Sequence, residues 1–323
     1  MNNVRSLLVF GLASVVGLAA LARTLPSPDL HVPALTALPE GATLLVLARP
    51  AQLRARGLWR LPPSSEPAKE LARIASTCGF DPLEGVDEIA VATPGSARHG
   101  AFGVVVSGSF LAAPREACAQ RLARDRDKHI ERSLAGPDRR FVLLTDTGGD
   151  GRATLAFTDG MIVGGDSGYV AEMLRTLATG EASAAADPTH AGLRRELLDG
   201  AALVASLRLT ADTRETIRRE LRDPKAPAGD IVGLLASVKT TPSIGLRGVV
   251  ACEDERAAAA MTEVVERMAK DAEASTTARF LGLVPLLRGR AVRTAGRAAV
   301  VSAEATPETA SLLLGAIGGA LSP

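Results

Sequence analysis

The sequence predicts an α+β fold of two related halves, each a small antiparallel or mixed sheet covered by helices, after an N-terminal hydrophobic helix. Three observations support it: an uncharged apolar run near the amino terminus, an order of elements that occurs twice, and a composition suited to a buried core. The chain has 323 residues, 46% of them hydrophobic, and a formal net charge of +1. This length is enough for one large domain or for two of ordinary size.

The first predicted element is a hydrophobic helix at residues 1–23. An uncharged, largely apolar run extends from Ser6 to Ala22 and is flanked by Arg5 and Arg23. As a helix it would span about 25 Å, close to the thickness of a bilayer core. A positive start, an apolar centre and small residues at the end also fit a cleavable signal peptide. Residues 1–23 are therefore predicted to be either a signal peptide or a membrane anchor, and both alternatives stay open.

Residues 24–39 are predicted to form a stalk. Prolines are spaced through this segment, and spaced prolines favour an extended, semi-rigid connector over a packed element; they are Pro26, Pro28, Pro33 and Pro39. The folded part is therefore expected to be exported. It would face the periplasm from an inner-membrane anchor, or be periplasmic or secreted if the signal is cleaved.

The first α+β half is predicted at residues 40–180. Its opening strand, 40–49, starts at an acidic-Gly turn and ends at an arginine, as a short buried strand does. The later elements follow from turn residues and apolar periodicity. They are helices at 51–59 and 66–77, strands at 86–92 and 103–106, a helix starting near Pro114, a hairpin of 141–145 with 154–158, and a closing helix from Tyr169.

The second half is predicted at residues 189–323, after an Ala/Ser-rich joint at 180–188. The run 199–208 resembles 40–49, and the same kinds of element follow it in the same order. This repetition predicts a duplication. The elements are helices at 212–222 and 229–238, a strand at 248–251, a helix opening at Glu253, a hairpin of 291–294 with 298–303, and a closing helix from Thr306.

The cysteines are the candidate site residues that the sequence offers. Cys78 and Cys118 lie about 40 residues apart in the first half, and Cys252 lies in the second. An exported protein can keep a disulfide, so Cys78 and Cys118 are the preferred pair. The alternative is that all three are small buried hydrophobic residues. No CxxC motif indicates zinc or a redox dithiol.

One passage carries a resemblance to other proteins. Cys78-Gly79-Phe80-Asp81-Pro82 ends a predicted helix, because Gly79 suits a left-handed cap and Pro82 prevents continuation. With the strand at 86–92, this passage resembles one in uncharacterised exported bacterial proteins that have an N-terminal membrane segment. The resemblance implies an envelope setting. It implies no activity and no functional residue.

Ser167 is the main candidate for catalysis, and the sequence argues against it. Gly165-Asp166-Ser167-Gly168 resembles the nucleophile loop of chymotrypsin-like serine proteases, but Tyr169 stands where that family has another glycine. None of the preceding histidines has that family's sequence context. We expect Ser167 instead to cap the helix that follows it.

No metal or cofactor site is predicted. Asp146, Asp150 and Asp159 flank or follow a glycine-rich turn, yet they lack the spacing and closing Glu of a calcium loop. Four histidines occur, none at helical ligand spacing, and surface or capping roles are expected for them; they are His31, His99, His129 and His190. No glycine-rich phosphate loop follows a strand.

The charge pattern excludes one class of partner. The net charge of +1 and 3% aromatic content do not suit nucleic acid, which needs a clustered basic surface. Residues 121–132 alternate acids and bases, which predicts a solvated helical face.

The predicted function is a non-catalytic cell-envelope protein that acts by protein or ligand binding, with no catalytic residue and no cofactor. Its expected partners are the membrane, if the N-terminal segment is retained, and an envelope protein. Two alternatives remain: a hydrolase with a hidden site near Ser167 or the Asp146–Asp159 hairpin, and a structural spacer.

Overall fold

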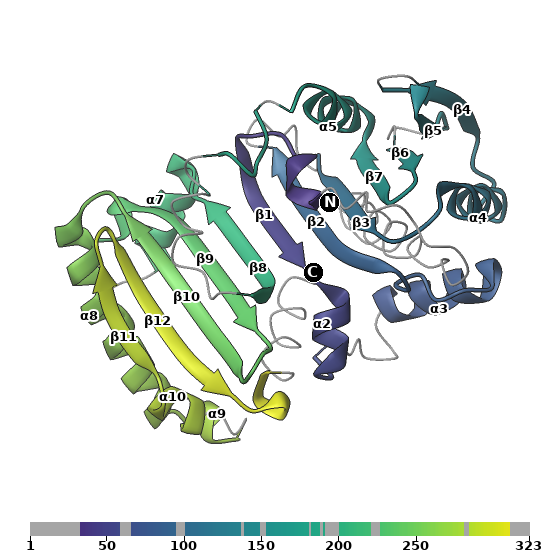
Figure 1. Cartoon of the computed structure of the whole chain (residues 1–323). Helices are drawn as coiled ribbons and strands as arrows, with labels where there is room; N and C mark the ends of the chain where they lie inside the picture. The colour runs from purple at the N-terminus through teal and green to yellow at the C-terminus, as the bar shows by residue number, and fades with distance from the viewer. Residues whose placement is uncertain are drawn as a thin grey trace. The chain divides into compact units, whose positions relative to one another are not determined.

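The computed structural model describes residues 33–58, 66–94, 101–136, 139–148, 153–180, 182–187, 190, 200–220, 227–280 and 284–310. The predicted N-terminal helix at 1–23 and residues 24–32 of the predicted stalk lie outside these ranges. The fold is α+β, with a large antiparallel sheet and helices packed on it (Figure 1). The chain divides into two compact units, and the main boundary falls between Asp187 and Pro188.

The elements of unit 1 begin with a 3₁₀ turn η1 and include two sets of strands separated by a helix. Their bounds are η1 (Ala34–Thr36), β1 (Ala42–Ala48), α2 (Pro50–Ala55), α3 (Glu66–Cys78), β2 (Val86–Pro94), β3 (Gly103–Gly108), α4 (Ala112–Arg124), β4 (Ile130–Ala135), β5 (Phe141–Asp146), β6 (Ala153–Thr158), β7 (Met161–Asp166) and α5 (Ser167–Thr179). Parts of β1 and α2 are assigned to unit 2.

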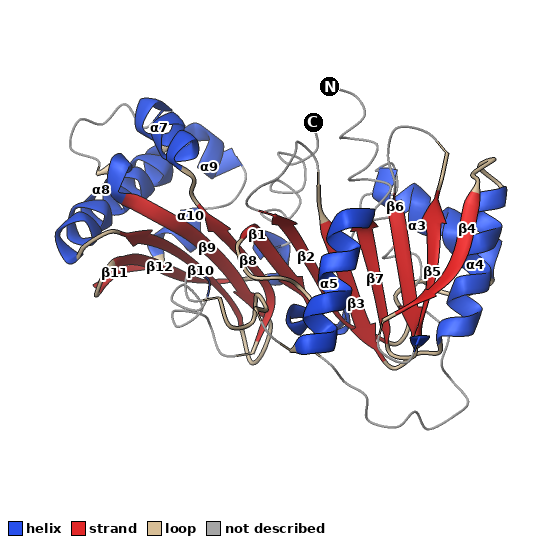
Figure 2. Ribbon diagram, turned by 90° about the horizontal axis from the view of Figure 1, so that it is seen from above, coloured by secondary structure: helices blue, strands red, loops and turns tan. Residues whose placement is uncertain are grey.

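The strands of unit 1 are paired in the order β2-β3-β7-β6-β5-β4, and every pair is antiparallel. The last strand of the β4–β7 meander therefore returns to pair with β3. Helices α3 and α4 lie on one face of this sheet and α5 on the other (Figures 1 and 2). Side chains that alternate along β3 serve both faces, so Val104, Val105 and Val106 are all fully buried.

The elements of unit 2 are fewer. They are β8 (Ala201–Arg208), α7 (Ala211–Glu220), η3 (Ala228–Asp230), β9 (Ile231–Lys239), β10 (Ile244–Cys252), α8 (Glu255–Ala274), α9 (Thr276–Phe280), α10 (Val284–Arg288), β11 (Ala291–Ala295) and β12 (Ala298–Ala305). The strand order is β8-β9-β10-β12-β11, again antiparallel throughout.

The helix predicted at 229–238 is wrong: most of that segment is strand β9. Its residues alternate between buried and more exposed positions from Ile231 to Leu235, which is the period of a strand. A run this short and this apolar does not distinguish a helix from a buried strand by itself. Its pairing with β8 and β10 decides the outcome.

The stalk prediction is also wrong for residues 33–39. Ala34, Ala37 and Leu38 are fully buried, and the backbone of this segment pairs with the segment 182–187 through Pro39 and Ser183. The Ala184 N–H donates to the Leu38 carbonyl at 2.7 Å. Proline spacing suggested an extended connector, but the apolar residues between the prolines are buried in unit 1. Within the predicted joint, Ser183, Ala184 and Asp187 are buried, and the boundary between the two units falls directly after Asp187.

The helical face predicted at 121–132 extends too far. Helix α4 ends at Arg124, Asp127 has a positive φ of 52°, and Ile130 begins β4. Charge alternation is equally suited to an exposed edge strand, and residues 131–134 of β4 are exposed. Strands β4 and β7 were not predicted.

Gly108 allows close approach of two backbones at the end of β3. A Cβ added there would overlap the carbonyl oxygen of Gly85 and come within 2.9 Å of the Asp87 nitrogen. We therefore expect Gly108→Ala to lower the free energy of unfolding by about 2 kcal/mol, the usual cost of overpacking. Urea denaturation measures this. Gly229→Ala is the control, since a Cβ at Gly229 meets nothing within 4 Å; equal effects of both changes would contradict the argument.

Candidate functional site

The junction of α3 and α4 in unit 1 holds the cysteines that the sequence analysis singled out. Helix α3 ends at Cys78 because Gly79 adopts a φ of 80° and its N–H donates to the Ala75 carbonyl at 2.8 Å. Helix α4 begins after Leu111, where the Asp159 carboxylate accepts from the Ala112 N–H at 2.7 Å. Asp159 thus satisfies one of the N–H groups left unpaired at a helix start.

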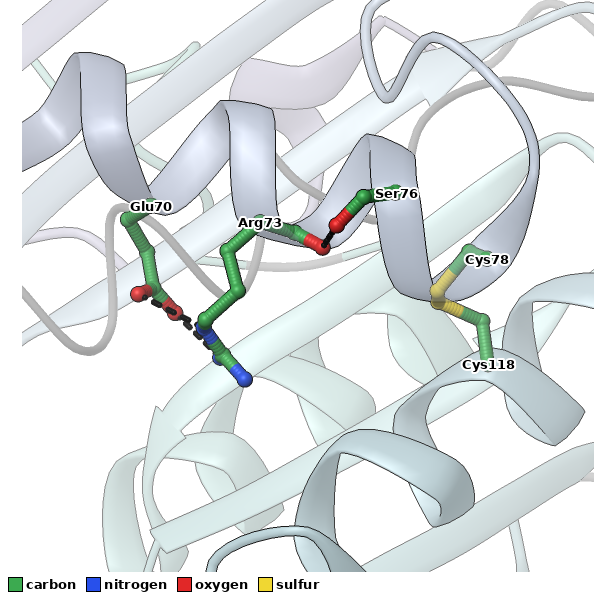
Figure 3. Close-up of a disulfide and its surroundings, with 5 residues drawn as sticks. All are labelled: Glu70, Arg73, Ser76, Cys78 and Cys118. Atoms are coloured by element: carbon green, nitrogen blue, oxygen red, sulfur yellow. Dashed lines mark hydrogen bonds and ion pairs between the residues drawn. A yellow bond between two sulfur atoms is a disulfide. The ribbon is translucent and has the colours of Figure 1, made fainter.

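Cys78 and Cys118 form a disulfide in the structure (Figure 3). Their Cα atoms are 5.4 Å apart, within the ordinary range for such a bond. Cys118 is fully buried on α4, and Cys78 is partly buried at the end of α3. A disulfide placed this way joins two helices and closes a loop of 40 residues. Its first role is therefore to stabilise the junction.

A charged cluster supports the same junction one to two turns away on α3. The Glu70 carboxylate accepts from Arg73 at 2.6 Å, as Figure 3 shows, and also from Arg126 beyond the end of α4. Burial acts to raise the pKa of Glu70, but the hydrogen bond from Arg73 and the positive charge of Arg126 outweigh it and lower that pKa. The carboxylate is therefore ionised at neutral pH and ties α3 to the turn that follows α4.

Arg115 is a buried cation on α4, three residues before Cys118. The whole residue is inaccessible to solvent. Its guanidinium donates to the carbonyls of Leu111 at 3.2 Å and Glu84 at 3.4 Å and lies 3.6 Å from the centre of the Phe110 ring. Its Nε has no hydrogen-bond partner. The charge is compensated by carbonyl dipoles and an aromatic face, which is weaker compensation than a carboxylate would give.

Burial lowers the pKa of Arg115 to about 9. In unfolded chains the pKa of this group is higher than in the folded protein, so above pH 9 the unfolded state binds more protons than the folded one. We therefore expect wild-type stability to rise relative to Arg115→Met between pH 8 and pH 10.5, by about 2 kcal/mol. Chemical denaturation of both proteins at several pH values measures this, because their other titrating groups are shared. A pH-independent difference would contradict it.

Ser167 does not cap α5; Asp166 does. The Asp166 carboxylate accepts from the Gly168 N–H at 3.0 Å, and Ser167 is the first helical residue. The Ser167 hydroxyl lies 2.8 Å from the Thr154 hydroxyl, which lies 3.1 Å from that of Thr145. A threonine hydroxyl is not a base, so this chain of hydroxyls does not activate Ser167 as a nucleophile. It ties the start of α5 to β6 and β5.

The Asp146–Asp159 hairpin does not gather its carboxylates. Asp146 accepts from the Gly148 N–H at 2.9 Å and pairs with Lys128 at 3.1 Å, whereas Asp159 caps α4. Asp150 lies outside the described residues. Within the described ranges, no group of three His, Cys, Asp or Glu side chains could hold a metal ion.

His190 differs from the expected surface role. It is fully buried, and its Nδ1 lies 2.7 Å from the hydroxyl of Ser206 on β8. The distance suits a nucleophile and its base, but Ser206 is only 2% exposed. Both residues are buried, and the pair is a buried hydrogen bond. His129 is exposed, as expected, and His31 and His99 lie outside the described residues.

Sequence reasoning missed the burial of both Arg115 and His190. Arg115 lies between Pro114 and Glu116 in a helix rich in charge, where an exposed side chain is the usual outcome. Its contact with the Glu84 carbonyl, 31 residues away in the chain, is one that no local pattern indicates. Cys252 is buried at the end of β10, and burial together with the nearby Asp230 and Asp254 charges raises the pKa of its thiol to about 11.

No known family matches this sequence, and no curated protein does. Among solved structures, crystal forms of a protein named TP0453 are similar. Form III has a TM-score of 0.49 at 12% identity and covers 88% of this chain and 99% of that one. Form I has a TM-score of 0.48 at 12% identity, covering 91% and 100%. Within the described ranges, no helix combines the length and apolar character needed to cross a membrane.

Proposed function

We propose that this chain is an exported cell-envelope protein that acts by binding a partner and not by catalysis. The observation that carries the proposal is the Cys78–Cys118 disulfide. Disulfides persist in the periplasm and outside the cell and are rare in the reducing cytosol. The buried position of Cys118 and the joining of two helices make a structural bond the natural role.

The N-terminal segment supports export independently of the disulfide. An uncharged run from Ser6 to Ala22 after a positive start suits either a cleaved signal or a retained anchor. A retained segment would make the membrane the first partner. The protein would then belong to the exported, membrane-tethered bacterial proteins that the passage around Cys78 resembles.

We propose a duplicated scaffold as the frame for this function. In unit 1, two neighbouring strands β2 and β3 lead into α4, and the hairpin β6–β7 returns to β3 before α5. In unit 2, β9 and β10 lead into α8, and the hairpin β11–β12 returns to β10 before a helical turn at 307–310. Both hairpins have two-residue turns, Asp159-Gly160 and Gly296-Arg297.

This correspondence changes the matching suggested by the sequence. The sequence matched the hairpin at 141–158 with the hairpin at 291–303. The hairpin β6–β7, however, pairs with β3 through β7, just as β11–β12 pairs with β10 through β12. Unit 1 then has one additional hairpin, β4–β5. It also has the helix α3 between α2 and β2, where unit 2 has no helix of that length among its described residues.

The test of export uses the natively produced protein. Thiol alkylation of the denatured chain, followed by intact mass, is expected to label Cys252 alone without reductant and all three cysteines with it. Labelling of all three without reductant would overturn the export proposal. Membrane fractionation of the same sample shows whether residues 1–22 are retained.

The test of partner binding is crosslinking in intact envelopes with a lysine-reactive reagent. We expect a specific second protein to be recovered with this chain. Recovery of this chain alone, at reagent doses that crosslink known envelope complexes, would contradict partner binding and favour the structural spacer.

A further inference from the structure

A disulfide and a buried arginine connect the same two segments of unit 1. Cys78 ends α3, and its sulfur is bonded to Cys118 on α4 (Figure 3). Arg115 lies three residues before Cys118 on α4, and residues at this spacing are neighbours on a helix surface. Its guanidinium donates at 3.4 Å to the carbonyl of Glu84, which lies in the loop that follows α3. The end of α3 and the loop 79–85 are therefore held against α4 at two neighbouring points.

The contact made by Arg115 is the unfavourable one of the two. Its guanidinium is enclosed completely, donates to two carbonyl oxygens and leaves Nε without a hydrogen-bond partner. Among the described residues, no carboxylate forms an ion pair with Arg115, and burial alone lowers its pKa. A cation removed from water needs a charged partner or complete hydrogen bonding, and this one has neither. Closing the junction therefore costs the hydration of the guanidinium, and opening restores it.

Apolar side chains favour the closed junction. Ile74 on α3 is fully buried, and Phe80 and Leu83 in the loop are 9% and 6% exposed. The other residues of α3 from Ala68 to Cys78 are partly buried or exposed. A helix of 13 residues is marginally stable when it is detached from the fold. Apolar burial and the hydration of the guanidinium thus act in opposite directions on the same small element.

The disulfide restrains the loop at one of its two ends. With the bond intact, Cys78 stays beside Cys118, so the loop that begins at Gly79 cannot separate from α4 at its start. At the other end, the Gly85 carbonyl accepts from the Ser109 N–H at 2.8 Å. The loop is therefore fixed at both ends in the oxidised protein and at one end only after reduction.

We propose that this junction is a redox-sensitive device: reduction of the disulfide by a dithiol lets α3 and the loop 79–84 open away from α4, which hydrates Arg115 while the sheet of unit 1 stays paired. The inference goes beyond the proposed function and does not depend on a partner for this chain. The open form is a minor state in equilibrium with the closed one, because the buried apolar side chains still favour closure.

The chemical step is a thiol–disulfide exchange. A thiolate of the dithiol attacks the sulfur of Cys78, the more exposed of the two cysteines, and Cys118 leaves and takes up the proton that the attacking thiol lost. The second thiol of the dithiol then attacks the mixed disulfide and releases Cys78 as a thiol. Two electrons pass to the cysteines, and the dithiol is oxidised to its own disulfide.

The first experiment measures alkylation of Cys118 in the native, reduced protein by peptide mass spectrometry. Cys118 is fully buried in the closed junction, so iodoacetamide reaches it only when the junction opens. We expect labelling of Cys118 to be at least about tenfold faster in the wild type than in Arg115→Met, because methionine gains nothing from hydration. Cys252, which is buried in unit 2, should label at the same rate in both proteins.

The matched control variant is Arg121→Met. Arg121 is an exposed arginine on the same helix, so its removal should leave the labelling rate of Cys118 at the wild-type value. Equal labelling of Cys118 in the wild type and in Arg115→Met would overturn the proposal, because the buried cation would then not drive the opening.

The second experiment uses the wild-type protein alone and so does not depend on the folding of a variant. On addition of dithiothreitol, we expect hydrogen exchange of the amides in α3 and the loop 79–84 to become at least about tenfold faster, while the amides of β3 and β7 stay protected. Unchanged exchange would show that the junction stays closed after reduction. Equal acceleration in the sheet would show that unit 1 unfolds as a whole. Either result would overturn the proposal.

Discussion

Removing the disulfide with Cys78→Ala and Cys118→Ala is expected to lower the free energy of unfolding by about 4 kcal/mol. The closed loop has 40 residues, and the chain-entropy relation for a loop of that length gives a stabilisation of about this size. The loop includes β2 and β3, so its closure restricts a large part of unit 1 in the unfolded state. Urea denaturation of the oxidised protein and of the double variant measures the difference.

Two controls separate the covalent bond from the loss of side-chain volume. Reduction of the wild-type protein should reproduce most of the effect, because the sulfur atoms remain in place. Cys252→Ala should leave the response to reductant unchanged, since this thiol is unbonded to another cysteine. A double variant as stable as the wild type would show that the disulfide adds no stability to the junction of α3 and α4.

Glu88→Gln is expected to lower the free energy of unfolding by about 3 kcal/mol. Glu88 is 7% exposed on β2, and one carboxylate oxygen accepts from Arg49 at 3.1 Å while the other accepts from the Ala34 N–H at 3.1 Å. Removing the charge of Glu88 weakens an ion pair whose carboxylate is buried and also weakens the acceptor of the Ala34 N–H. The Arg49 side chain is 32% exposed, so water offsets part of the loss and the lower end of the usual range applies.

The matched control for Glu88 is Glu172→Gln. Glu172 pairs with Arg175 on the surface of α5 at 3.7 Å, with both side chains well exposed. Exposed pairs of this kind contribute at most about 0.5 kcal/mol. A cycle with Arg49→Met measures the coupling between Glu88 and Arg49 directly. A coupling near zero would mean that the Ala34 contact, and not the ion pair, accounts for the effect.

Local sequence signals predicted correctly the features that depend on residues close together in the chain. Gly79 ends α3 because a left-handed residue is needed there, and the acidic residues before Arg256 start α8, where Asp254 accepts from the Ala257 N–H at 2.7 Å. The hairpin of β5 with β6 follows from its flanking apolar runs and its glycine-rich turn. The spacing of Cys78 and Cys118 singled out the pair that the structure joins.

Contacts between distant segments determined the strands and buried residues that local signals could not predict. The segment 231–239 became a strand because β8 and β10 pair with it on both sides. Leu38 is buried because the backbone at 182–184 pairs with it, although the prolines around it suggested a stalk. Arg115 and His190 are enclosed by segments distant in the chain, and no local pattern distinguishes them from surface residues.

By itself, the sequence determined the α+β class, the bounds of α3, the apolar N-terminal run and the preferred cysteine pair. Each depends on backbone conformation or hydrophobicity within a few turns of chain. The tertiary structure alone decided which strands pair and which hairpin pairs with β3 or with β10. Those outcomes depend on the register between strands far apart in the chain, and a shift of one residue would exchange the two faces of every strand.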